Sequence, residues 1–373
     1  MSNMNFSDNS KNTIRATLMR GGTSKGLFLN PIDLPSTINE RDNLLLSIMG
    51  SPDATGMQLN GIGGGISSTS KVALISKSKR PNIDVDYLFG HVYIKEPYIN
   101  WSGSCGNLAA AVGLYAINNG FAQPNDDGSY CVKVWQVNLG YEIRVHIPKF
   151  LKDNLVSIPG IPGQENPIYV EFLDPSAGNS ILPDNKPIHF LNLPSGKTIP
   201  VTLILGANPT IFLYAKDLGL KGHELPDEID FTKLDPIITS LSRQGALIMG
   251  IEYSPSIRVS WLAEPLEYKT SDGNLISQEK YTLLGRISTE NRVHHAFTGT
   301  GAINLACAAK IPSTIPFNII NNNINNNPIS IGHPQGIIQV NANVEYNSSE
   351  KWVIKSSGFI RTAKTIMYGH VFP

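Results

Sequence analysis

The stretch Ser102-Gly-Ser-Cys105-Gly-Asn107-Leu-Ala-Ala-Ala-Val-Gly-Leu-Tyr-Ala116 places one cysteine in a turn of small residues, directly before a helix that is too apolar to face water. Backbone N–H groups at the start of a helix are unpaired and carry partial positive charge. They favour the thiolate form of a cysteine there and allow an anion to dock beside it. The segment therefore predicts either a proton-transfer site for a carboxylate substrate or a cysteine that only packs at a tight helix start.

The overall composition favours a globular protein with no charged partner. The chain has 373 residues, of which 41% are apolar, which is enough for two domains with cores of their own. Lys+Arg and Asp+Glu number 30 each, so no net charge recruits nucleic acid or an anionic membrane. An anionic substrate would have to be held by local charges and backbone N–H groups.

The cysteines and the N-terminal residues bear on the cellular compartment of the protein. Cys105, Cys131 and Cys307 are an odd number at wide spacings, which argues against a disulfide framework or a zinc site and fits a reducing compartment. The first ten residues are polar and lack the apolar core of a signal peptide. No run approaches the roughly 20 apolar residues of a membrane span. We therefore expect a cytoplasmic protein that does not enter a membrane.

Periodicity and turn residues predict the regular elements. Four glycines within 61–65 predict a loop, and the density of proline and glycine between about 148 and 200 predicts a domain boundary. Residues 1–12 are expected to form a disordered tail, and the asparagine-rich run 321–328 a surface loop. The expected elements are strands within 15–29, at 71–76, 85–94 and 131–137, and helices at 39–49 and 107–117.

The two halves of the chain resemble each other weakly. Gly21-Gly-Thr-Ser-Lys-Gly-Leu-Phe-Leu29 is echoed by Gly206-Ala-Asn-Pro-Thr-Ile-Phe-Leu-Tyr214, and in each half a glycine-rich turn precedes an alanine-rich helix. This order predicts a duplicated α+β domain, with the two helices buried at the domain centres and their N-termini facing one cleft. The expected domains are 13–188, to which a strand near 358–373 returns, and 189–357.

Lys71 begins an apolar strand just after the glycine loop, in Ser67-Ser-Thr-Ser-Lys71. Glycines let backbone N–H groups approach a ligand closely, and the hydroxyls add donors. Beside apolar neighbours a lysine amine can be neutral and act as a base. The alternative is an ordinary exposed lysine at a strand start. The spacing of a phosphate-binding P-loop is absent.

Two turns offer donors for carboxylate oxygens. Arg20-Gly-Gly-Thr-Ser-Lys25 presents two cations and two hydroxyls around a turn, as a tricarboxylate requires. The alternative is a hairpin with solvated charges. Asn208 occupies the matching turn in the second half and could present further donors.

The residues before the second alanine-rich helix favour structure over metal binding. His294 and His295, adjacent on an expected strand, would point to opposite faces and so could not bind one metal together. Thr298 and Thr300 are expected to cap the helix. Cys307 inside that helix is expected to pack as a small hydrophobe.

Six motifs spread over the chain carry a family resemblance. They are Met19-Arg-Gly-Gly-Thr-Ser-Lys-Gly26, Gly61-Ile-Gly-Gly-Gly65 with Ser68-Thr-Ser-Lys71, Ser104-Cys-Gly-Asn107, His295-Ala-Phe-Thr-Gly-Thr-Gly301, Gly332-His-Pro-Gln-Gly336 and Arg361-Thr-Ala-Lys364. Nearly end to end, the sequence resembles the PrpF-type family of 2-methylaconitate and aconitate isomerases, which shares the fold of diaminopimelate epimerase. The resemblance implies two similar α+β domains, each a curved sheet wrapped around a central helix, with the active site in the cleft between them.

The resemblance also separates two kinds of enzyme. Epimerases of this fold use two cysteines, one at each central helix; Cys105 matches the first, but the matching turn Thr300-Gly-Ala302 has no thiol. In the isomerase branch the resemblance assigns the second acid/base role to Lys71. It therefore implies a lysine–cysteine isomerase. Gln335 departs from the His-Pro-Ser-Gly segment that family members often carry.

The resemblance implies an isomerase of 2-methylaconitate or aconitate that needs no cofactor and no metal. It would act in propionate catabolism through the methylcitrate cycle, and it could be a homodimer or a monomer. Lys71 would remove an allylic proton, and Cys105 or Lys71 would return one. The alternatives are a keto–enol tautomerase of an unsaturated oxo-acid such as 4-oxalomesaconate, a non-catalytic carboxylate-binding protein, and a protein whose glycines and cysteine are only structural. The residues expected to bind substrate are Arg20, Gly22, Thr23, Ser24, Gly64, Gly65, Ser70, Gly106, Asn107, Asn208, Thr300, Gly301 and Gln335.

Overall fold

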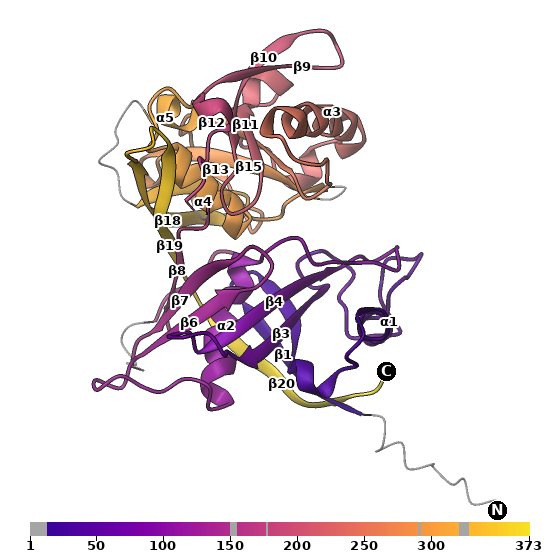
Figure 1. The fold of residues 1–373 in the computed structure, drawn as a ribbon. Helices are drawn as coiled ribbons and strands as arrows, with labels where there is room; N and C mark the ends of the chain where they lie inside the picture. The colour runs from indigo at the N-terminus through magenta and orange to yellow at the C-terminus, as the bar shows by residue number, and fades with distance from the viewer. Residues whose placement is uncertain (1–12, 150–154, 177, 290–291, 321–327) are drawn as a thin grey trace, which may run out of the picture.

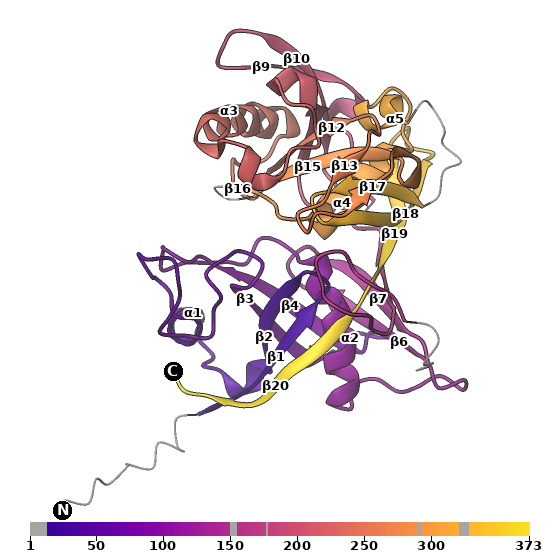
Figure 2. The ribbon, with the colours of Figure 1, turned by 180° about the vertical axis from the view of Figure 1, so that it is seen from behind.

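The structure, a computed structural model, describes residues 13–149, 155–176, 178–289, 292–320 and 328–373. The tail expected at 1–12 and most of the loop expected at 321–328 lie outside these ranges. Two lobes lie one above the other (Figure 1), and the view from behind shows the same division (Figure 2). The lower lobe holds the first half of the chain and its last strand, and the upper lobe holds most of the second half.

The first half forms strands where the sequence alternates or is continuously apolar. The helix expected at 39–49 forms as α1 and ends at Gly50, whose left-handed conformation (φ 75°) closes it. The elements are β1 (Ile14–Gly21), β2 (Ser24–Leu29), α1 (Ile38–Met49), β3 (Lys71–Lys77), β4 (Val85–Val92), β5 (Ile99–Asn100), α2 (Gly106–Asn118), β6 (Tyr130–Gln136), β7 (Tyr141–Ile147) and β8 (Ile168–Leu173), with short 3-10 turns at Pro31–Asp33 and Pro183–Asn185.

The second half contains the longest helix, α3, whose apolar face packs on the strands of the upper lobe through residues such as Leu234 and Leu241. The elements are β9 (His189–Asn192), β10 (Thr198–Ile204), β11 (Thr210–Tyr214), α3 (Phe231–Met249), β12 (Arg258–Ala263), β13 (Tyr268–Lys269), β14 (Leu275–Ile276), β15 (Leu283–Thr289), β16 (Arg292–Val293), α4 (Gly299–Ala308), α5 (Ile315–Ile319), β17 (Ile329–His333), β18 (Gly336–Tyr346), β19 (Trp352–Arg361) and β20 (Ala363–Val371), with 3-10 turns at Ala215–Leu218, Pro226–Glu228 and Gln278–Lys280.

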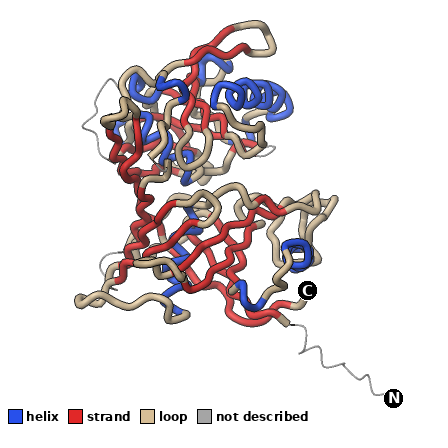
Figure 3. The backbone as a smooth tube through the Cα atoms, in the orientation of Figure 1, coloured by secondary structure: helices blue, strands red, loops and turns tan. Residues whose placement is uncertain are grey.

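A continuous series of hydrogen-bonded strands runs through both lobes (Figure 3). From β1 through β2, β3, β4, β6 and β7 to β8, successive pairs are antiparallel, parallel, antiparallel, parallel, antiparallel and antiparallel. From β10 through β11, β12, β15, β17 and β18 to β19 the same series recurs. β8 pairs with β19 where the lobes join, and β20 returns to pair with β1.

The central helices α2 and α4 are almost entirely buried, because helices that are apolar all round cannot face water. Ten of the thirteen residues of α2 and all ten residues of α4 are buried. Both helices pack into one hydrophobic core that spans the lobes, in which the rings of Phe172 and Phe359 lie 5.6 Å apart. The shared core therefore fixes the positions of the two helix N-termini relative to each other.

The protein has a mixed α/β fold with a large sheet and few helices, which confirms the mixed class predicted from sequence. The helix predicted at 107–117 is α2, and the loop predicted at 61–65 contains no regular element. Among the described residues, no helix combines the length and the apolarity that crossing a membrane would require.

Candidate active site

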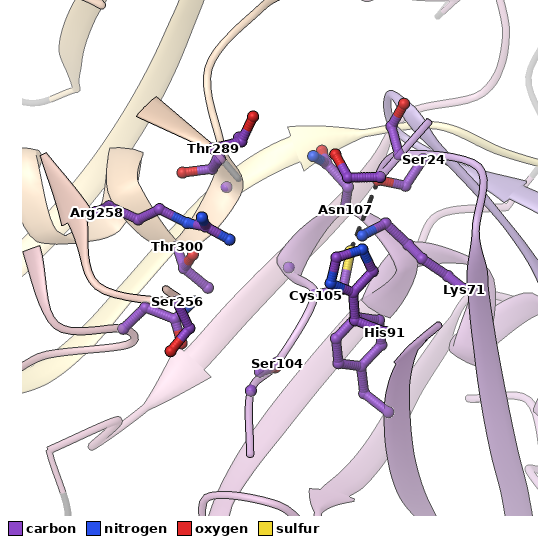
Figure 4. Close-up of a pocket in the computed structure, with 18 of the residues that line it drawn as sticks. Ser24, Lys71, His91, Ser104, Cys105, Asn107, Ser256, Arg258, Thr289 and Thr300 are labelled. Atoms are coloured by element: carbon purple, nitrogen blue, oxygen red, sulfur yellow. Dashed lines mark hydrogen bonds between the residues drawn. The ribbon is translucent and has the colours of Figure 1, made fainter. Parts of the chain in front are cut away.

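A pocket lies between the lobes, at the place where α2 and α4 begin. Lys71 and Cys105 line it from the lower lobe, and Arg258 and Thr300 line it from the upper lobe (Figure 4). Of the residues predicted from sequence, the structure places Ser24, Lys71, Cys105, Gly106, Asn107, Asn208 and Thr300 in its lining. Residues from both halves of the chain therefore meet at one cavity.

The two helix N-termini that border the pocket touch each other. A Cβ atom added at Gly299 would lie 3.5 Å from the backbone nitrogen of Asn107, and one added at Gly106 would lie 3.7 Å from the carbonyl carbon of Gly299. The two helix starts are therefore neighbours, and the tighter contacts of the added Cβ atoms are with the ring of Phe359, at 3.2 Å for Gly106 and 3.1 Å for Gly299. Unpaired N–H groups and the positive ends of both helix dipoles gather at one point, which suits an anionic ligand.

Lys71 is the first residue of β3, where it is half-buried. Its Nζ atom lies 5.3 Å from the centre of the Phe89 ring, and in the strand register it stands opposite His91 of β4. The aromatic face supports the stem of the side chain and attracts the cation. Figure 4 shows the amine directed toward the thiol of Cys105.

Cys105 is the N-cap residue of α2 and is 8% exposed. Its side chain makes no capping hydrogen bond, which leaves the sulfur available to the pocket. The Sγ atom donates to Ser24 Oγ at 3.7 Å, so the turn between β1 and β2 helps to orient the thiol. An amine and a thiol, two groups that can transfer protons, therefore both line the lower wall of the pocket.

Asn107 presents a donor to the pocket because its oxygen is already used. The guanidinium Nε of Arg361 donates to Asn107 Oδ1 at 2.7 Å, so the amide nitrogen of Asn107 is the atom that remains to donate to a ligand. Burial lowers the pKa of Arg361 to about 9. In the upper lobe the Oδ1 atom of Asn304 accepts from the N–H of Ala207 at 2.9 Å, and its nitrogen donates to the carbonyl of Asn208.

The charge of the lining favours an anion. Lys71 and Arg258 face each other across the pocket, and none of the described residues that line it is acidic (Figure 4). His294 also lines it; burial lowers its pKa well below the usual value, and His295, Arg258 and Lys71 lower it further. Hydroxyl groups from both lobes add donors: Ser24, Ser68, Ser104, Ser256, Thr289 and Thr300.

Arg20 lies outside the pocket, contrary to the sequence prediction. Its guanidinium pairs with Glu165 and donates to the carbonyl oxygens of Gly22 and Thr362 at 3.0 and 3.1 Å. The cation therefore ties the β1–β2 turn to the segment between β19 and β20. Arg258 supplies the second cation of the pocket instead.

The glycine loop is also built for packing. A Cβ atom at Gly61 would lie 2.1 Å from the backbone nitrogen of Gly50, so glycine is required where the loop crosses the end of α1. The N–H of Gly65 donates to Gln58 Oε1, and the hydroxyl of Ser70 is buried between Gln58 and Val92. Gly64, Gly65 and Ser70, predicted to bind substrate, are therefore not in the lining of this pocket; Gly65 lines an adjoining cavity that shares Ser67, His91 and Thr289 with it.

The remaining predicted residues have other environments. Gln335 is in the turn after β17, with its side chain against Gly160, and is not part of the lining. Gly22, Thr23 and Gly301 flank the pocket without lining it. A Cβ atom at Gly22 would lie 2.4 Å from Asn107 Oδ1, so this glycine gives Asn107 its place.

The expectation for the two histidines was wrong. The rings of His294 and His295 stack with centroids 4.5 Å apart and planes at 20°; β16 ends at Val293, and the chain bends at His295. Thr298 is the N-cap of α4 and accepts from the N–H of Gly301 at 3.1 Å, whereas Thr300 lies inside the helix. Among the described residues, no group of three or more His, Cys, Asp or Glu side chains forms a metal site.

Sequence reasoning missed most of the upper wall of the pocket. Arg258 opens β12 after a serine–proline turn, Ser256 precedes it, and Thr289 ends β15. These are isolated polar residues at strand ends, and no local sequence signal assigns them to a site. His91 was missed because the register that places it opposite Lys71 is set by strand pairing.

The family model described as PrpF protein matches residues 11–373. The 2-methyl-aconitate isomerase of Shewanella oneidensis is 36% identical to the chain over 388 residues, which cover 96% of each protein. The (4E)-oxalomesaconate Delta-isomerase of Novosphingobium sp. is 31% identical over 367 residues, which cover 95% of this chain and 96% of the relative.

Solved structures of similar proteins agree with these sequence comparisons. The crystal structure of a methylitaconate-delta-isomerase matches with a TM-score of 0.77 and 31% identity, and covers 96% of this chain and 95% of its own. A probable proline racemase from Agrobacterium radiobacter, 12% identical, has a TM-score of 0.58 over 95% of this chain and 92% of its own, a likeness of fold alone. Since the family model spans nearly the whole sequence and relatives above 30% identity are named isomerases, the chain belongs to the PrpF family and is an isomerase.

Proposed function

We propose that the chain isomerises a small unsaturated tricarboxylate, 2-methylaconitate or aconitate, by moving an allylic proton between Lys71 and Cys105. The observation that carries this proposal is the pairing of an amine and a thiol on one wall of a pocket whose described lining contains two cations and no acid. The name of the Shewanella relative supports the choice of substrate.

The chemistry follows from the acidity of the substrate. A C–H bond beside a C=C that is conjugated with a carboxylate can lose its proton if the resulting dienolate is stabilised. Lys71 in its neutral form takes the proton, and the electron pair of the broken bond spreads onto the carboxylate oxygens. Rotation or a shift of the double bond follows, and Cys105 or the protonated Lys71 returns a proton to carbon. General acid–base catalysis of this kind contributes roughly 10²–10⁴-fold per group.

Binding of the carboxylates is assigned to both lobes. Arg258 and the N-terminal N–H groups of α4 hold one end of the substrate, and the N–H groups of α2 with the Asn107 amide hold the other. We also propose that 13–188 with 358–373 and 189–357 are two duplicated epimerase-like domains, which the repeated strand pairing supports. The free thiols support the proposed reducing, cytoplasmic location. A role in the methylcitrate cycle is proposed together with the substrate 2-methylaconitate.

Replacing Arg258 with glutamine is expected to raise KM by roughly 10–100-fold, because hydrogen bonds to a charged group contribute about 1.5–3 kcal/mol each. Steady-state kinetics with the preferred acid measures this. Arg258→Lys keeps the charge but loses the planar pair of donors, so its KM is expected to lie between those of the wild type and Arg258→Gln. The control is Arg80→Gln, whose guanidinium stacks on Trp135 at 4.7 Å, away from the pocket. An unchanged KM in Arg258→Gln contradicts this assignment.

Proton NMR in D2O tests the proposed function. The protein is incubated separately with trans-aconitate, 2-methylaconitate and 4-oxalomesaconate, and both isomerisation and deuterium uptake are followed. Isomerisation of aconitate or 2-methylaconitate with deuterium uptake at the allylic carbon is expected. Turnover of 4-oxalomesaconate alone would instead favour the tautomerase that the Novosphingobium relative suggests. Turnover of none of the three acids would contradict both.

A further inference from the structure

His294 lies in the wall of the pocket, and the proton transfer proposed above gives it no task. Its backbone N–H donates to the carbonyl of Ile287 at 2.9 Å, and its ring stacks on His295. The residue is buried, with 8% exposure, yet it lines the pocket. The imidazole is therefore held in place before a substrate arrives.

One nitrogen of this ring is bonded to the backbone. The N–H of Ala296 donates to His294 Nδ1 at 3.0 Å. A backbone amide nitrogen can only donate, so Nδ1 is the acceptor and carries no proton. In a neutral imidazole the single proton is then on Nε2, which is the remaining donor of the side chain.

The surroundings keep the ring neutral. Burial is the main cause that lowers the pKa of His294; the neighbouring His295, Arg258 from β12 and Lys71 from β3 lower it further, and the hydrogen bond with the Ala296 backbone raises it by less. A neutral imidazole holds its N–H proton very tightly, so it serves as a hydrogen-bond donor that does not itself transfer the proton. This distinguishes it from Lys71 and Cys105, which exchange protons with the substrate.

We propose that Nε2–H of His294 donates a hydrogen bond to the substrate carboxylate on which negative charge builds as the allylic proton leaves. The inference rests on the proposed function. When the C–H bond breaks, its electron pair becomes the new π bond of the dienolate and the charge reaches oxygen; when carbon is reprotonated, that charge leaves oxygen again. The histidine keeps its proton throughout. A donor fixed in advance stabilises the charge without reorganisation, and removing one such donor costs roughly 10²–10³-fold in kcat.

Kinetics of three variants test the proposal. His294→Phe keeps a ring for stacking but has no nitrogen, and its kcat is expected to fall roughly 10²–10³-fold with a smaller change in KM. His294→Gln carries an N–H donor and is expected to recover part of the loss. The control is His295→Phe, which keeps the stacked ring and does not line the pocket. A kcat near wild type in His294→Phe, or an equal loss in His294→Gln and His294→Phe, overturns the proposal.

A second measurement does not depend on turnover. In protein labelled with ¹⁵N-histidine, NMR is expected to show His294 protonated on Nε2 only, without titration between about pH 6 and 8. Tricarballylate, a saturated tricarboxylate that cannot isomerise, is expected to shift the Nε2–H resonance. A proton on Nδ1, or a resonance that saturating tricarballylate leaves unmoved, overturns the proposal. If the wild-type protein isomerises no acid, the proposed function fails, and this measurement alone decides the role of His294.

Discussion

Lys71→Met is expected to lower turnover of the preferred acid by roughly 10²–10⁴-fold, the contribution of a general base. Methionine keeps an unbranched stem of similar length against the Phe89 ring and removes the amine, which is both the proposed proton acceptor and one of the two cations of the pocket. The fold should therefore survive, with an unchanged thermal unfolding midpoint. Steady-state kinetics, together with deuterium uptake by the substrate in D2O, measures the loss.

The matched control for this change is Lys77→Met, at the other end of the same strand, where the side chain is exposed. It should turn over at the wild-type rate. Near wild-type turnover in Lys71→Met would remove the amine from the mechanism. A loss shared equally by both variants would show that strand β3 is disturbed rather than that a base is missing.

Cys105→Ala is expected to lower isomerisation by a similar factor, roughly 10²–10⁴-fold, because the proposed function gives this thiol the second proton-transfer role. The side chain makes no capping hydrogen bond, so its loss should leave α2 intact. Cys131→Ala, in β6 and outside the pocket, is the control. Wild-type isomerisation by Cys105→Ala would contradict the role of the thiol.

Deuterium exchange can separate the two roles. A variant that lacks only the group that returns the proton still removes one, so its substrate exchanges with D2O without changing isomer. If Lys71 is the base and Cys105 the acid, exchange without isomerisation is expected in Cys105→Ala, and neither process in Lys71→Met. The reverse pattern would assign the base to the thiol.

The parts of the site that depend on local sequence were predictable. Small residues before an alanine-rich run indicate a buried helix that begins near Cys105, and a lysine at the start of an apolar run after a loop indicates its place on β3. The weak repeat between the two halves also predicted that the N-termini of the two helices face one cleft. Each of these signals lies within a few residues of the position that it describes.

The errors arose where partners distant in sequence decide the role. Arg20 is in a glycine turn and has the features of a ligand-binding cation, but Glu165 and the carbonyl of Thr362 engage it. Arg258 has no such signal around it and enters the pocket only because β12 pairs with β11 and β15. The histidine pair was misplaced because a strand was assumed to continue beyond Val293.

The return of β20 to β1 has a consequence for the order in which the molecule can assemble on the ribosome. Domains usually fold as they emerge, N-terminal first. Here β1 has two neighbours: β2, which follows it directly, and β20, which is made only after the strands of the upper lobe, with Ile14 opposite Val371. The upper lobe, although encoded later, has all its strands through β19 before the lower lobe receives its final one. Until β20 has emerged, the side of β1 that does not pair with β2 remains an open edge of the kind that invites aggregation.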